Sequence, residues 1–139
     1  MHDNKIKKYH IVIDENTRYI IELEAHFCGD DLQVVICGGT EYHIGAVALA
    51  VPVYEYHGKP ADSATVNSLC LFGHKDDEIA RYASKYLSIT LKSTVSVTAG
   101  VHIDAPTKHE IEHLMENCKI ACEKLSQTIL ADSIEDKIN

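Results

Sequence analysis

Residues 19–37, YIIELEAHFCGDDLQVVIC, carry the clearest indication of the fold class of this chain. Apolar and polar residues alternate over 19–27, a period typical of a strand with one buried face. The apolar side consists of Tyr19, Ile21, Leu23, Ala25 and Phe27, and the polar side of Glu22, Glu24 and His26. Residues 29–31, Gly-Asp-Asp, favour a turn, and 32–37 return as a second strand. The stretch therefore predicts an antiparallel hairpin.

The rest of the chain extends this hairpin into a sheet and then adds helices. Further strands are predicted at 9–13, 43–56, 66–72 and 94–104, and helices at about 76–92 and 108–130, with a loop at 57–60. The order is strand five times, helix, strand, helix. Strands grouped before helices predict an α+β fold, an antiparallel sheet of about six strands with both helices on one face. We expect one domain over 1–139, with an ordered core of about 9–130.

The two helices carry apolar stripes. The first stripe is Ile79, Ala80, Ala83, Tyr86, Leu87, Thr90 and Leu91, and the second is Ile111, Leu114, Cys118, Ala121, Leu125 and Ile129. Thr107 and Glu110 match a capping box at the start of the second helix.

The strand at 43–56 is apolar on both sides between Ile44 and Val51, so both of its faces need a cover. The helices would supply one cover and a second subunit the other. Small residues here permit a close approach: Gly45, Ala46, Ala48 and Ala50. The helix-free face would also carry polar side chains, from Glu22, Glu24, His26, Ser96, Thr98 and His102. Such a face is either solvated or used in dimerisation and ligand binding.

Composition excludes several classes of protein. The formal net charge is −8, and no basic run or aromatic-basic stripe predicts a nucleic-acid partner. The N-terminus lacks the apolar segment of a signal peptide, and the longest apolar stretch is too short to span a bilayer. The five cysteines include no CxxC pair, which indicates reduced thiols and a cytoplasmic location.

Residues 109–113, HEIEH, match the HExxH pattern of zinc proteases. At about 100° per residue, His109 and His113 fall on the solvent side of the helix, away from its apolar stripe. No downstream His completes the longer zinc-protease pattern. We therefore predict no metal site and no catalytic residues, and keep a small metal-dependent hydrolase as an alternative.

Two segments have the composition of a ligand site. Residues 38–45, GGTEYHIG, place three glycines at a strand break, where backbone N–H groups can approach a ligand or a tight loop can need positive φ. Residues 72–78, FGHKDDE, join a strand to a helix start, a junction that can suit a phosphate. Asp76 and Asp77 would oppose an anion, and on these residues alone ordinary capping is the favoured interpretation. His102 near the end of the last strand is of interest only if it converges with His43 or His74.

Together, Gly38-Gly39-Thr40-x-x-His43-Ile44-Gly45-Ala46-Val47-Ala48 and Gly73-His74-Lys75-Asp76-Asp77-Glu78 resemble a small bacterial family of prenylated-flavin chaperones. That family is related in fold to the proteasome assembly chaperones. The resemblance implies a homodimer built through the sheet that binds prenylated FMN, or FMN, as cargo. It would deliver or mature the cargo for a UbiD-like decarboxylase without turnover of its own.

The resemblance also implies a site. The helix start at His74 and Lys75 would take the flavin phosphate, and the glycine loop would lie against the ring or the ribityl chain. The implied cofactor-binding residues are Gly38, Gly39, Thr40, His43, Gly45, His74, Lys75 and His102. The competing hypothesis is an assembly chaperone or interaction domain that holds a protein partner and no cofactor.

Overall fold

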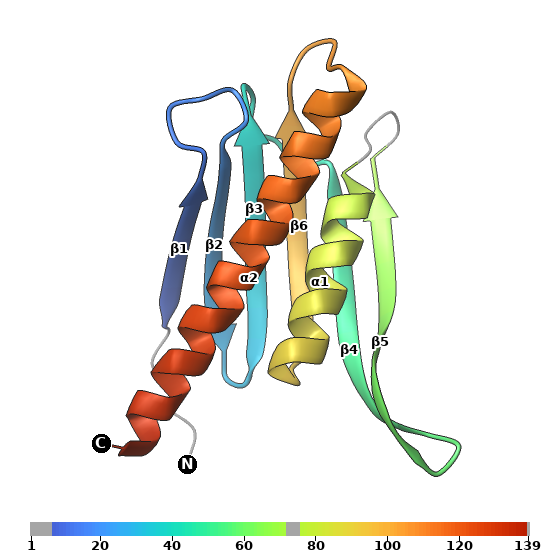
Figure 1. Cartoon of the computed structure of the whole chain (residues 1–139). Helices are drawn as coiled ribbons and strands as arrows, with labels where there is room; N and C mark the ends of the chain where they lie inside the picture. Colours follow the sequence, from blue (N-terminus) through green and yellow to red (C-terminus); the bar gives the residue numbers. More distant parts are fainter. Residues whose placement is uncertain (1–6, 72–75, 139) are drawn as a thin grey trace.

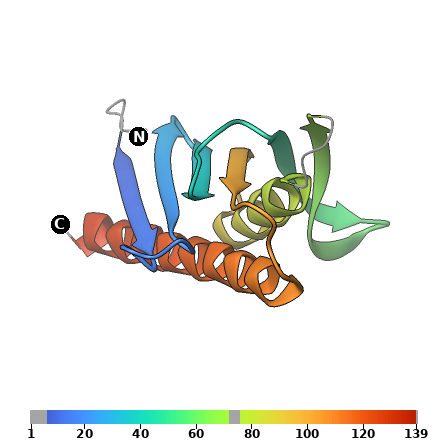
Figure 2. The ribbon, with the colours of Figure 1, turned by 90° about the horizontal axis from the view of Figure 1, so that it is seen from above.

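A six-stranded sheet carries both helices on one face in the computed structural model, which describes residues 7–71 and 76–138. The strands are β1 (Lys8–Ile13), β2 (Ile21–Cys28), β3 (Asp31–Gly39), β4 (Ala46–Tyr56), β5 (Lys59–Cys70) and β6 (Val95–His102), and the helices are α1 (Asp77–Leu91) and α2 (Lys108–Ile138). Figure 2 shows both helices below the sheet. The α+β class, the element order and the one-sided helix layer are confirmed.

The strand order across the sheet is β1-β2-β3-β6-β4-β5. Most neighbours are antiparallel, as predicted, but β3 and β6 are parallel, so the expectation of a wholly antiparallel sheet is wrong for this pair. The reason is the crossover through α1, which returns the chain so that β6 runs in the same direction as β5. Both strands are antiparallel to β4, and β6 inserts between β3 and β4. The chain from β3 to β4 therefore passes the end of β6 (Figure 2).

The core lies between the sheet and the helices. Alternate residues of the central strands are fully buried there, among them Ile21, Leu23, Val34, Ile36, Val95, Val97 and Ala99. The hairpin predicted from residues 19–37 is confirmed, with Leu23 opposite Ile36 and Ala25 opposite Val34. The small side chains of Ala46 and Ala48 also face this core, where α1 packs on β4. The small side chains at these positions allow α1 to approach β4 closely.

The helix stripes are confirmed with exceptions. In α1, Ile79, Ala80, Ala83 and Leu87 are buried, whereas Tyr86, Thr90 and Leu91 are only partly buried. Two serines that the apolar pattern passed over, Ser84 and Ser88, are buried because their hydroxyls donate to the carbonyls of Arg81 and Ser93. In α2, Ile111 is 49% exposed, contrary to the prediction.

The second helix is longer than predicted, ending at Ile138. Its capping box is confirmed: Glu110 N–H donates to Thr107 Oγ1, and Thr107 N–H donates to Glu110 Oε1. Within residues 7–71 and 76–138, no helix has both the length and the apolar character needed to cross a bilayer.

The fifth strand, β5, begins at Lys59 and not at residue 66 as predicted, whereas β4 begins at Ala46 and not at residue 43. The β4–β5 hairpin projects beyond the other strands (Figure 1). Residues 57–60 were expected to form a loop, but the turn is only His57 and Gly58, both at positive φ, as type I′ turns require. Pro60 lies within β5, which is an edge strand, the kind of strand to which proline is largely confined within sheets.

The helix-free face has an apolar side and a polar side. The apolar side, called here the β4–β5 strip, consists of Val47, Leu49, Val51 and Leu69. These side chains are 41%, 46%, 45% and 80% exposed. On the polar side, Glu22 of β2 pairs with His10 of β1 at 2.6 Å and accepts the Tyr42 hydroxyl.

Candidate functional site

The connection from β3 to β4 and the start of α1 meet at one end of the sheet. His43 Nε2 lies 3.0 Å from Asp76 Oδ2, and the backbone N–H of Val101 in β6 donates to Asp76 Oδ1 at 2.9 Å. Asp76 is only 4% exposed. This carboxylate therefore joins three segments that are distant in the sequence. We call His43, Asp76 and His102, with their neighbours, the rim.

The side chain of Asp76 does not cap α1, so that part of the capping prediction is wrong. It makes no hydrogen bond to the first turn, although the Asp76 carbonyl accepts from Ala80 N–H to open the helix. A buried carboxylate requires hydrogen-bond partners, and here they lie across the site, in β6 and the β3–β4 connection. The residue thus positions the helix start against the sheet.

The glycines of the site permit close contact between protein segments. A Cβ on Gly45 would overlap the Asp76 carboxylate, and a Cβ on Gly39 would overlap the His102 carbonyl. Gly39 also has φ of +75°, which a larger residue rarely adopts. A Cβ on Gly38 would meet the Ile20 carbonyl, and one on Gly100 would meet the carbonyl of His43. Close packing against another described segment therefore explains why each of these positions is a glycine.

The two histidines of the rim converge. The ring centroids of His43 and His102 are 6.3 Å apart, with the rings nearly perpendicular. Thr40 holds the backbone of His102, since its N–H donates to the His102 carbonyl at 2.8 Å. His102 Nε2 also lies 2.9 Å from Asp104 Oδ1. Of the predicted site residues, His74 and Lys75 lie outside the described residues, and the other six cluster at this end of the sheet.

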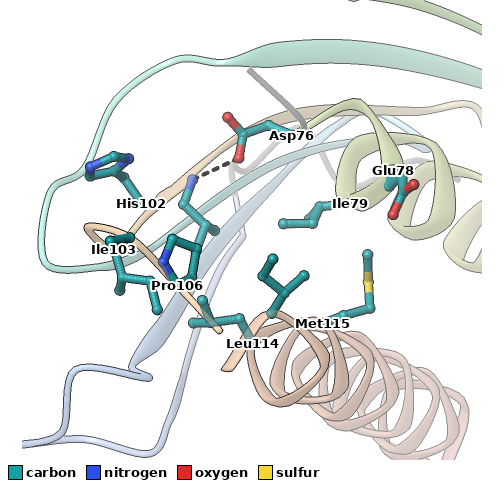
Figure 3. Close-up of a pocket in the computed structure, with 11 residues that line it drawn as sticks. Asp76, Glu78, Ile79, His102, Ile103, Pro106, Leu114 and Met115 are labelled. Carbon is teal, nitrogen blue, oxygen red and sulfur yellow. Dashed lines mark hydrogen bonds between the residues drawn. The ribbon is translucent and has the colours of Figure 1, made fainter. Parts of the chain in front are cut away.

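A cavity of about 360 Å³ opens beside the rim, on the helix side of the sheet. It is lined by Asp76, Glu78, Ile79, Val101, His102, Ile103, Ala105, Pro106, Ile111, Leu114 and Met115. Figure 3 shows Ile79 of α1 facing Leu114 and Met115 of α2, with Ile103 and Pro106 on the other side. Asp76 and His102 belong to both the rim and the cavity, so the polar groups border an apolar hollow.

The sequence indicated half of this site. His43, Thr40 and His102 stood out because of their residue types and their glycine neighbours. Asp76 looked like an ordinary helix cap. Leu114 belonged to the apolar stripe predicted for the second helix, and Met115 lay beside that stripe. Only the crossing of α1, β6 and α2 brings these side chains together.

The two histidines of the HExxH match differ in their surroundings. His109 is 97% exposed, whereas His113 Nε2 bonds Asp14 Oδ2 at 2.8 Å and its ring stacks on Tyr19. Asn117 donates to the same Asp14 oxygen, so α2 holds the β1–β2 loop. No group of three or more His, Cys, Asp or Glu side chains arranged to hold a metal occurs in the part of the chain that the structure describes.

A search of solved structures identifies the class of fold. The chain is similar to a protein in the crystal structure of a novel chaperone complex for yeast 20S proteasome assembly, with a TM-score of 0.57. The similarity covers 91% of this chain and 96% of the yeast chain at 15% identity, so it shows the fold alone. The fold is therefore that of a proteasome assembly chaperone, as predicted.

The family follows from sequence comparison. The family model of the prenylated flavin chaperone LpdD-like domain matches residues 15–130, and the chain belongs to this family. It is also similar to protein LpdD of Lactiplantibacillus plantarum, with 30% identity over 99 residues, covering 70% of this chain and 68% of the relative. The resemblance proposed from the glycine and GHKDDE segments is confirmed.

Proposed function

We propose that this protein binds prenylated FMN and delivers or matures it for a UbiD-like decarboxylase, as a non-catalytic homodimer in the cytoplasm. Membership of the prenylated flavin chaperone family supports a role in flavin maturation. The observation that carries the proposal is the apolar cavity whose lining includes Asp76 and His102 of the rim, with His43 held against Asp76 beside it. An apolar hollow with a few fixed polar groups is the usual form of a small-molecule site.

The residues fit a flavin cargo in part. The eight apolar residues lining the cavity suit an aromatic ring, and imidazole groups such as those of the rim are able to hydrogen-bond ring heteroatoms. His43 and His102 are the proposed polar contacts, and Thr40 with Gly38, Gly39 and Gly45 shapes the wall behind them. A phosphate contact by His74 and Lys75 remains a prediction, since both lie outside the described residues.

The homodimer is proposed from the β4–β5 strip. Four large apolar side chains on one open face, the most exposed being Leu69 at 80%, form the kind of patch that marks an interaction site. Because β4 is apolar on both faces, its outer face needs a cover, and a second copy placed there would supply it. The five free cysteines are consistent with the reducing cytoplasm.

Binding of the cargo is tested with purified protein and prenylated FMN. The carrier should take up the flavin, shown by its absorbance after gel filtration, and should gain thermal stability. A ligand at a hundredfold excess over Kd adds about 2.7 kcal/mol to the free energy of unfolding. Delivery is tested by adding the loaded protein to an apo UbiD-like decarboxylase and comparing the recovered activity with that given by free cofactor.

The β4–β5 strip also favours a second candidate, an assembly chaperone that holds a protein and no cofactor. Its exposed apolar side chains suit a protein partner as well as a second copy. The same binding experiment separates the two functions, because such a protein would acquire neither flavin absorbance nor thermal stability from prenylated FMN.

A further inference from the structure

We infer that the cavity beside the rim receives the ring system of the flavin and that the phosphate stays outside it, turned to solvent. This orientation rests on the proposed function. It assigns the apolar residues of α1 and α2 a ligand role that the sequence did not indicate, and it differs from the hypothesis of a phosphate held at the start of α1.

The lining of the cavity selects an uncharged aromatic group. Eight of the eleven lining residues are apolar, and no lysine or arginine occurs among those that the structure describes there. Met115 offers a thioether, which makes favourable contacts with aromatic rings. In Figure 3 this side chain rises between the helices toward Ile79 and Glu78. A flat ring entering between α1 and α2 would contact apolar groups on both sides.

The charges of the cavity oppose a phosphate. Among the described residues that line it, the two charged ones are Asp76 and Glu78, and both are acidic. Asp77 adds a third carboxylate in the first turn of α1. A phosphate monoester carries between one and two negative charges near neutral pH, so these carboxylates repel it. His102 is the one lining imidazole among the described residues, and it already lies against Asp104.

The size of the cavity agrees with partial entry. Its 360 Å³ lies near the lower limit of about 300–1,000 Å³ for small-molecule pockets. A ring system therefore fills the hollow and leaves the ribityl phosphate beyond its mouth. A phosphate exposed in this way remains available to the enzyme that receives the cargo.

The orientation is tested by comparing prenylated FMN with its phosphatase product, in which only the phosphate has been removed. Affinities are measured by flavin fluorescence for the wild type and for Ile111→Trp. Ile111 lines the cavity and is half-exposed, so a larger side chain there blocks the hollow without entering the core. Ile134→Trp is the matched control, on another exposed position of α2 that does not line the cavity.

We expect the two ligands to bind the wild type within threefold of each other. Ile111→Trp should weaken both by more than tenfold, and Ile134→Trp should leave both within twofold. A tenfold loss on removing the phosphate, reproduced by Lys75→Ala, would overturn the orientation in favour of a phosphate held at the helix start. Wild-type affinity in a folded Ile111→Trp variant would remove the cavity from the site. Failure of the wild type to bind either ligand would instead contradict the proposed function.

Discussion

Asp76 shows how much one buried carboxylate determines at this end of the molecule. Its two oxygens face Val101 N–H and the His43 imidazole, while its own carbonyl opens α1. A helix start, the central strand β6 and the β3–β4 connection are thereby held together. The position of α1 against the cavity depends on these contacts.

We expect Asp76→Ala to lower the free energy of unfolding by about 1–3 kcal/mol, because it leaves a buried N–H without its acceptor. Urea denaturation measures the loss. Asp77→Ala is the control, since that neighbouring side chain is less buried and lies in the first turn of the helix. Equal effects of the two substitutions would contradict the bridging role of Asp76.

Gly45 tests whether the glycines serve close packing. We expect Gly45→Ala to cost about 1–3 kcal/mol, the usual range for an overpacked site, because its Cβ would overlap the Asp76 carboxylate. Gly29→Ala separates overlap from backbone strain: Gly29 has φ of +64° and open space around it. This control should lose about 1–2 kcal/mol, the cost of a left-handed backbone for an L-residue. A milder effect at Gly45 than at Gly29, by thermal or urea unfolding, would argue against the overlap.

At the scale of elements, α2 is held to the sheet at its start by polar contacts as well as by its apolar stripe. Asp14, in the β1–β2 loop, accepts hydrogen bonds from Asn117 and His113, and these bonds hold the pKa of its carboxyl below the ordinary value of 3.8. Tyr19 donates to Glu110 in the same region. Glu110 and His113, two residues of the HExxH match, thus hold the β1–β2 loop against α2.

The lowered pKa of Asp14 predicts a pH dependence of stability. A carboxyl whose pKa is lower in the folded state stabilises the fold fully above its unfolded value, and the contribution disappears as the pH falls through the folded value. We therefore expect the free energy of unfolding of the wild type to fall below about pH 4, and the fall to be smaller in Asp14→Asn. Denaturation series between pH 2.5 and 6, roughly the range over which the ordinary aspartate pKa is crossed, measure the difference. Identical slopes in both proteins would contradict the assignment.

At the scale of the whole molecule, the sheet has one covered face and one open face. The helices cover the first, and the second divides into the β4–β5 strip and a polar side around Glu22 and His10. This division explains how one strand, β4, can be apolar on both sides: Ala46 and Ala48 face α1, and Val47 and Leu49 face outward.

We expect the wild type to sediment as a dimer and Leu49→Glu to sediment as a monomer, because a charge at the centre of the β4–β5 strip would be buried without a partner. Leu49 is 46% exposed in the single chain, so the monomer should keep its fold, as circular dichroism can show. Lys124→Glu, on an exposed position of α2, is the control and should remain dimeric. A monomeric wild type would contradict the proposed interface.

Local periodicity in the sequence was enough to predict several parts of this protein. The alternation over residues 19–37, the helix stripes and the Thr107–Glu110 capping box depend on neighbours a few positions apart, so the hairpin, the element order and the one-sided helix layer were predicted correctly. The glycine and GHKDDE segments also indicated the family, because motif and spacing are local properties.

The strand order, the parallel β3–β6 pair and the site depend on contacts between segments that are distant in the sequence. The crossover through α1 inserts β6 between β3 and β4, which no local pattern specifies. It carries Val101 and His102 to Asp76 and His43, while α2 brings Leu114 and Met115 across from Ile79. A carboxylate that appears in the sequence as a helix cap thus becomes the link of a cavity wall, because burial and partners from distant segments determine what a side chain does.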